Sequence, residues 1–327
     1  MIDSSAAARA LPEFVAPLGH GIHAIDTGFH RPLFDAAYLI VERGRAAFVD
    51  TGTNHSVPRL LDALAGLGLG VDAVDFVIAT HVHLDHAGGV GLLMQSLPKA
   101  RVVVHKRGAR HLADPSHLVR SATTVYGADE IERSYGALVP VDASRIVATR
   151  DETMIELAGR PLVFLDTPGH AMHHHCIWDA ASRGFFTGDT FGLSYREFDT
   201  AAGPWIMPTT TPVQFQPEAL RRSIERMLAF GPEWIYLTHY GRVGDVRRLG
   251  TLLLAQLDEM VALARATPAG PARHAELRRG LESIHLKSLR AHGVALSEAR
   301  IRELLALDLE LNAQGIAIWL DRERGKT

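Results

Sequence analysis

The sequence predicts an α/β fold that is followed by a helical extension. Three observations lead to this prediction. Short apolar runs with strand character alternate with helical patterns up to about residue 248. Beyond that point the apolar residues follow helical spacing only. Prolines and glycines punctuate the segments. We therefore expect an α/β domain at residues 1–248 and a helical C-terminal extension at residues 249–327.

The first third of the chain is expected to alternate between strands and helices. The predicted strands are residues 38–41, 46–50, 76–80 and 101–105. Gly44 lies in the turn that joins the first two of them. Ser56 is predicted to cap a helix that has Pro58 in its first turn, and residues 87–97 should form the next helix.

The middle of the chain continues the alternation. Residues 110–145 are polar, and we expect a partly helical insertion near the site. Further strands are predicted at residues 162–165, 176–178, 184–187 and 234–237. A loop rich in Thr and Pro spans 192–217, and a helix from Pro217 should end before Gly231.

The C-terminal part is predicted to be helical throughout. Residues 249–266, 272–292 and 297–312 have helical apolar spacing, and Ser297 is a suitable N-cap. An apolar stripe on the last of these helices contains Ile301, Leu304, Leu305 and Leu309. This stripe indicates either a core contact or a homodimer interface through the C-terminal helices.

Composition narrows the class of function. The 327 residues are 47% hydrophobic and 22% charged, and the formal net charge of -3 provides no basic field for nucleic acid. The single cysteine, Cys176, excludes an internal disulfide and fits a reducing compartment. Residues 1–18 show no signal peptide, and no apolar run reaches the roughly 18 residues of a membrane helix. We expect a soluble cytoplasmic protein with a small-molecule substrate and neither nucleic acid nor membrane as partner.

The most informative feature is the sequence from His81 to His86, which reads H-V-H-L-D-H. Imidazole and carboxylate groups bind borderline divalent metals such as zinc, iron and manganese. His81 and His83 follow a strand and lie on one side of it, whereas Asp85 and His86 face the other way. Such a loop can serve two ions.

Three further residues can complete the ligand sets of two metal ions. We assign His81, His83 and His170 to the first metal, Asp85, His86 and His239 to the second, and Asp189 to a bridge between them. The predicted cofactors are two divalent ions per chain, with zinc as the first choice and iron or manganese as alternatives.

A two-metal centre of this composition predicts hydrolytic chemistry. Two ions about 3.5–4 Å apart share a water and lower its pKa from 15.7 to around 7, so a bridging hydroxide exists at neutral pH. Two divalent ions, two aspartates and one hydroxide leave a positive centre, which stabilises an oxyanion. Asp85 and Asp189 are therefore predicted as catalytic residues, and Asp85 can accept a proton.

These motifs resemble the metallo-β-lactamase superfamily. The resemblance covers roughly residues 20–245 and includes the F-V-D-T-G turn at 48–52. It implies a four-layer αβ/βα sandwich with the metals at the edge of its two sheets. The true β-lactamases typically have cysteine where Asp189 stands, and they are exported. This chain looks more like the glyoxalase II and lactonase side. Its runs at 169–174 and 208–212 are similar to a branch of stand-alone members whose substrates are poorly defined.

Residues around the ligands have simpler interpretations beside the functional ones. Lactonases have a tyrosine at a similar place, but fewer residues after the position of Asp189 than Tyr195 is. Tyr195 is therefore a catalytic candidate only as a residue that lines the substrate pocket. Asp50 is expected to support the His81 loop through hydrogen bonds. His174 is expected to pack and hydrogen-bond, His173 either to pack or to face substrate, and Cys176 to be a buried apolar residue.

Three classes of function follow in order. The first is a dinuclear metal-dependent hydrolase of a small ester, thioester or lactone. The second is a non-haem iron redox protein, either a sulfur dioxygenase or an oxygen-binding di-iron protein. The third is a phosphodiesterase or nuclease, which the absence of a basic-aromatic platform disfavours.

Overall fold

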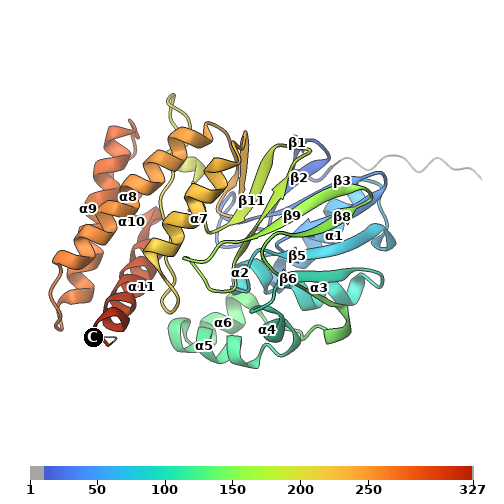
Figure 1. Ribbon diagram of the computed structural model, residues 1–327, viewed down its shortest axis with the longest axis horizontal. Coiled ribbons are helices and arrows are strands. Elements are labelled where there is room, and N and C mark those ends of the chain that lie inside the picture. Colours follow the sequence, from blue (N-terminus) through green and yellow to red (C-terminus); the bar gives the residue numbers. More distant parts are fainter. Residues whose placement is uncertain (1–10, 326–327) are drawn as a thin grey trace, which may run out of the picture. The chain divides into compact units, whose positions relative to one another are not determined.

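The computed structural model describes residues 11–325 and contains two mixed sheets flanked by helices (Figure 1). The chain divides into two compact units. The first runs to Phe164 and includes Asp179–Ser182, and the second comprises Leu165–Trp178 and the chain from Arg183 onward. Part of the segment expected to lack a signal peptide, residues 1–10, lies outside the described residues. None of the helices within 11–325 is long and apolar enough to cross a membrane.

The first sheet has seven strands whose order in the sheet is their order in the chain. They are β1 Val15–Gly19, β2 Ile22–Asp26, β3 Ala36–Glu42, β4 Arg45–Val49, β5 Val74–Ala79, β6 Arg101–His105 and β7 Ile146–Thr149. The first four pair antiparallel, and β4 to β7 pair parallel. Because β4 and β5 are parallel neighbours, their carboxyl ends meet at one edge. Asp50 and Thr80 follow these two ends.

The helices of the first unit include one departure from the prediction. They are α1 Val57–Gly66, α2 Leu84–Ala87, α3 Val90–Ser96, α4 Ala109–Ala113, α5 Ser116–Tyr126 and α6 Ala128–Tyr135, with 3-10 turns η1 Asn54–Ser56, η2 Val71–Ala73 and η3 Ala143–Arg145. The helix expected at 87–97 is divided, so Asp85 and His86 lie inside the short α2. The chain turns between α2 and α3 because Gly89 N–H donates to the Gly52 carbonyl at 2.9 Å.

The predicted cap at Ser56 is also corrected. Ser56 precedes α1, but its side chain does not bond to that helix. Thr53 instead caps the η1 turn, and the Ser56 hydroxyl accepts a hydrogen bond from Thr53 N–H at 3.3 Å. The capping box therefore belongs to the η1 turn that precedes α1, and the helix itself has no side-chain cap.

The second sheet has six strands in the order β13-β12-β11-β10-β9-β8. They are β8 Thr153–Leu157, β9 Arg160–Asp166, β10 His175–Asp179, β11 Gly184–Gly188, β12 Trp234–Leu237 and β13 Gly241–Val243. β11 and β12 are parallel. Their carboxyl ends therefore lie side by side; Asp189 follows β11 directly, and His239 is the second residue after β12.

Helices dominate the remainder of the second unit. They are η4 Arg196–Phe198, α7 Pro217–Ala229, α8 Val246–Ala266, α9 Arg273–Ala291, α10 Glu298–Leu304 and α11 Ala306–Arg324, and α8, α9 and α11 pack together (Figure 1). Ser297 caps α10 as predicted, with its hydroxyl accepting from Arg300 N–H at 3.2 Å. The helix expected at 297–312 breaks at Leu305, and α11 continues to Arg324. The boundary at 248/249 falls near the start of α8 and stays a prediction.

Candidate metal centre

Asp50 and His86 form a buried pair in the first unit. His86 Nδ1 lies 2.8 Å from Asp50 Oδ2, and both side chains are fully buried. The other Asp50 oxygen accepts from Thr80 N–H at 2.8 Å. An ionised carboxylate can only accept, so the His86 proton lies on Nδ1. The Nε2 lone pair of His86 is therefore the one that can bind a metal.

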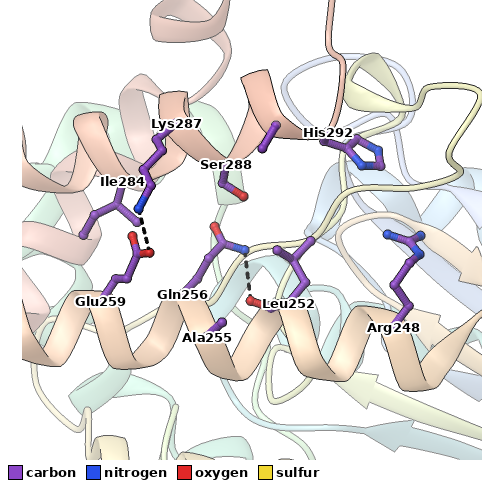
Figure 2. A pocket seen from close by; sticks show the side chains of 10 residues that line it. Arg248, Leu252, Ala255, Gln256, Glu259, Ile284, Lys287, Ser288 and His292 are labelled. Carbon is purple, nitrogen blue, oxygen red and sulfur yellow. Dashed lines mark hydrogen bonds and ion pairs between the residues drawn. The ribbon is translucent and has the colours of Figure 1, made fainter.

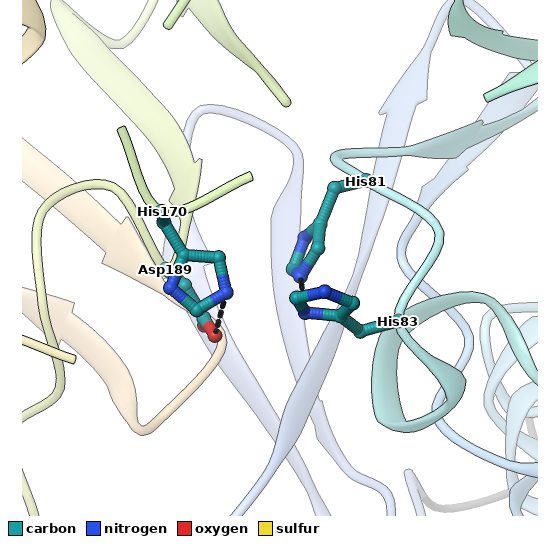
Figure 3. A group of neighbouring side chains, drawn as sticks. All are labelled: His81, His83, His170 and Asp189. Atoms are coloured by element: carbon teal, nitrogen blue, oxygen red, sulfur yellow. Dashed lines mark hydrogen bonds and ion pairs between the residues drawn. The ribbon is translucent and has the colours of Figure 1, made fainter. Parts of the chain in front are cut away.

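The remaining candidate ligands of this loop form two close pairs. His81 Nε2 lies 2.7 Å from His83 Nδ1, and Figure 3 shows the two rings side by side. Asp85 Oδ2 lies 3.7 Å from His86 Nε2. The loop thus presents an imidazole pair and a carboxylate–imidazole pair.

Asp189 is the centre of the arrangement in the second unit. Its Oδ2 lies 3.1 Å from His170 Nε2, and its Oδ1 lies 3.7 Å from His239 Nε2. Figure 3 draws the first of these contacts. All three residues are buried. The two oxygens of one carboxylate therefore face two different histidines, an arrangement that would let the carboxylate bind two metal ions.

Hydrogen bonds orient the ligands of the second unit. His170 Nδ1 lies 3.3 Å from the Thr209 carbonyl, so Nδ1 carries the proton and Nε2 faces Asp189. His174 Nε2 accepts from Asp189 N–H at 3.2 Å. His174 thus packs and hydrogen-bonds as predicted, and it fixes the backbone that carries Asp189.

Comparison with known proteins identifies the family. The model of the metallo-β-lactamase superfamily matches residues 30–239. The chain belongs to this superfamily. Its two mixed sheets with flanking helices agree with the αβ/βα sandwich, so the predicted fold class is confirmed.

Two curated relatives and one solved structure show the range of likeness. A metallo-β-lactamase fold-containing protein of Sulfurisphaera tokodaii is 26% identical over 228 residues, which cover 68% of this chain and 79% of that protein. An acyl-coenzyme A thioesterase of Gallus gallus is 30% identical over 192 residues, 53% of this chain and 64% of that enzyme. The structure of a metallo-β-lactamase family protein from Thermus thermophilus superimposes with a TM-score of 0.62 at 26% identity, covering 83% of this chain and 91% of that chain.

The His and Asp side chains of the present chain are of the types that bind divalent metal ions. Five imidazoles and two carboxylates are the ligand types of zinc, iron and manganese, and the chain offers them as His/Asp groups able to bind metal. The tautomers of His86 and His170 follow from contacts on this chain, and both leave Nε2 as the donor.

Tyr195 lies in a different environment from the ligands. Its side chain is buried, and its hydroxyl donates to the carboxylate of Asp308 on α11, 3.1 Å from each oxygen. Tyr195 therefore ties the segment after β11 to the C-terminal helix. Its catalytic role stays a prediction.

A cavity of about 350 Å³ lies between α8 and α9 (Figure 2). Its charged groups already have partners: Lys287 Nζ lies 3.1 Å from Glu259, and Arg248 donates to the Pro204 carbonyl at 3.0 Å. None of the predicted metal ligands lines it. This cavity gives no support to the metal chemistry.

The sequence interpretation missed the residues that hold His170. The Thr209 carbonyl accepts a hydrogen bond from His170, and Asn312 accepts one from Thr210 N–H. Gly315 gave no signal in the sequence, because it lies beyond the helix predicted at 297–312, and only the structure places it inside α11.

Proposed function

We propose that this protein is a dinuclear metal-dependent hydrolase that cleaves a small ester, thioester or lactone. The observation that carries the proposal is Asp189, whose two oxygens face His170 and His239. A carboxylate placed between two imidazoles is suited to join two metal ions. Membership of a superfamily of this ligand chemistry supports the same assignment.

The proposed ligand set is the one that the sequence predicts. One ion is held by His81, His83 and His170, the other by Asp85, His86 and His239, and Asp189 is shared. Zinc is the first choice, with iron and manganese as alternatives. When bound, two such ions lower the pKa of a coordinated water towards neutrality and polarise a carbonyl oxygen.

The residues of the chain prepare this chemistry. Asp50 holds the His86 ring through its Nδ1 proton, and the Thr209 carbonyl holds His170 in the same manner. Asp85 is half-buried and can accept a proton from the attacking water. Tyr195 remains a candidate catalytic residue at the substrate pocket.

Among the three substrate types we put thioesters first. The support is the thioesterase of Gallus gallus, 30% identical, although the match spans 64% of that enzyme. We also propose that the protein acts in the cytoplasm on a small molecule, that it has neither nucleic acid nor membrane as partner, and that any self-association uses the C-terminal helices.

The decisive experiment is a hydrolysis screen at known metal content. Metal-free protein is reconstituted with zinc, iron or manganese, and thioesters, lactones and phosphodiesters are compared. We expect turnover of a carbonyl substrate that is lost with the metal and restored by it. Stoichiometric iron with substrate-dependent oxygen uptake would instead establish a redox protein, and turnover of phosphodiesters alone would establish the third class.

A further inference from the structure

We propose that the C-terminal helix α11 positions the candidate ligand His170, and that Asn312 is the positioning residue. The connection runs through the loop at residues 208–211, which lies between the helix and the histidine. This inference rests on the proposed function, because it gives His170 a metal to hold.

The first step of the connection joins the helix to the loop. Asn312 Oδ1 accepts from Thr210 N–H at 2.7 Å, and its Nδ2 donates to the Pro208 carbonyl at 3.4 Å. The Asn312 side chain is completely buried. Pro208 and Thr210 flank Thr209 on either side. One amide group therefore holds the backbone both before and after Thr209.

The second step joins the loop to the histidine. The Thr209 carbonyl lies 3.3 Å from His170 Nδ1, and the Thr211 hydroxyl donates to the His170 carbonyl at 3.3 Å. The loop thus contacts both the ring and the backbone of His170. Rotation of the Thr209 carbonyl would release the ring that now directs Nε2 towards Asp189.

The close approach of α11 depends on Gly315, which lies almost one helical turn beyond Asn312. A Cβ atom added at Gly315 would lie 2.2 Å from Thr210 Oγ1 and 2.6 Å from the Thr211 carbonyl oxygen. Even a methyl group would therefore push the helix and the loop apart. Glycine is unfavourable inside a helix, so its presence here indicates that the contact itself is required.

A purely structural role for this contact makes a different prediction from a positioning role. If Asn312 only docked α11, its loss would lower the free energy of unfolding and leave metal affinity unchanged. If it positions His170, its loss also weakens one metal, because groups that orient ligands contribute about 10-fold to 100-fold in metal affinity.

The experiment compares full-length wild type with Asn312→Ala, Gly315→Ala and the control Gln256→Ala. Gln256 is a matched control because it is also a buried helical amide, and its Nε2 donates to the Ile206 carbonyl at 2.6 Å. Zinc stoichiometry and the affinity of each equivalent are measured by chelator competition. The absorption spectrum of the cobalt(II) form reports the ligand geometry, and urea unfolding reports stability.

We expect one of two zinc equivalents to bind about 10-fold to 100-fold more weakly in Asn312→Ala and Gly315→Ala, with an altered cobalt spectrum. Gln256→Ala should lose stability only. If Asn312→Ala does not fold, Gly315→Ala decides. If wild type binds two metals and hydrolyses its substrate, unchanged metal affinities in the Asn312 and Gly315 variants would overturn this inference alone. An equal loss of metal affinity in Gln256→Ala would do the same. A wild type that binds no metal would overturn the proposed function as well.

Discussion

At the scale of single residues, several candidate histidine ligands are oriented in the same way, by a hydrogen bond to one ring nitrogen. His86 is bonded through Nδ1 to Asp50, His170 to the Thr209 carbonyl, and His81 to the Thr80 hydroxyl at 3.2 Å. In each, the second ring nitrogen faces another candidate ligand. Orientation of this kind raises the basicity of a ligand and fixes its tautomer. The rings are thus held by the protein before any metal arrives.

Asp189 provides the first test at this scale. We expect Asp189→Ala to remove at least one metal equivalent per chain and most of the activity, because the change deletes the carboxylate that faces both His170 and His239. Metal analysis after gel filtration gives the stoichiometry. Asp199→Ala, at an exposed position, is the control. A variant that retained two metals would show that Asp189 is not the bridge.

Asp50 separates orientation from ligation. This residue has a positive φ of 55°, and its carboxylate accepts from His86 and from Thr80. We expect Asp50→Ala to weaken one metal by about 10-fold to 100-fold. Removal of a buried hydrogen-bond partner should also cost about 1–3 kcal/mol of unfolding free energy.

Asp50→Asn refines this test. The asparagine oxygen can still accept from Thr80 N–H, but an amide NH2 cannot accept the His86 proton. We therefore expect it to recover part of the stability and none of the metal affinity. Chelator competition and urea unfolding measure the two quantities. Full metal affinity in both variants would remove Asp50 from the orientation of His86.

Site residues were predictable from the sequence where their partners lie close in the chain or on a neighbouring strand. They were not predictable where the partners lie far away in the chain. His81, His83, Asp85 and His86 are predictable because metal ligands of one loop follow a short spacing. Asp50 could be predicted as support because it follows the neighbouring strand. Asn312 is separated from Thr210 by 102 positions, and only tertiary packing brings an uncharged amide of this kind to the loop.

At the scale of elements, two parallel strand pairs place the candidate residues. β4 and β5 deliver Asp50 and the His81 loop, and β11 and β12 deliver Asp189 and His239. These largely buried strands were predictable from their apolar runs, which are rich in aromatic or β-branched residues in β5, β11 and β12. The short strands β1, β2, β7, β8 and β13 were not predicted, because their apolar runs are shorter than four residues or, in β1, are interrupted by Pro17.

The packing of α8 against α9 gives a pH-dependent prediction. His285 on α9 is fully buried, with Nδ1 3.1 Å from Gln256 Oε1 on α8, and burial lowers the pKa of His285 to about 4. The unfolded chain, with a pKa near 6.5, binds a proton between about pH 4 and 6.5 that the folded protein does not bind. His285 therefore has no destabilising effect above pH 6.5, and its penalty grows as pH falls.

The difference amounts to about 2 kcal/mol of unfolding free energy between pH 7 and pH 5. We expect His285→Gln to lose this part of the pH dependence, whereas His117→Gln, at an exposed position, should retain it. Urea unfolding at both pH values measures the effect. Equal pH dependence in wild type and His285→Gln would show that His285 is protonated in the folded protein.

At the scale of the whole molecule, the superfamily match covers the fold but not the C-terminal helices. The fold class follows from alternating elements and is confirmed by the superfamily match over residues 30–239. The C-terminal helices lie beyond that match and contact residues within it, as Asn312 contacts Thr210 and Asp308 contacts Tyr195. Substrate choice is expected to depend on such added segments, which explains why the family motifs define the chemistry more closely than the substrate.

Metal binding should stabilise the whole protein if the native state alone assembles the ligands. An unfolded chain does not hold His/Asp groups in a fixed geometry, so each ion binds the folded state preferentially. At free zinc about 100-fold above a site's Kd, we expect that site to add about 2.7 kcal/mol to the free energy of unfolding. Urea unfolding of metal-free protein in buffered zinc measures this gain, and Asp189→Ala should show a smaller one. Identical unfolding curves for metal-free and zinc-saturated wild type would mean that the histidines and aspartates do not form a metal site.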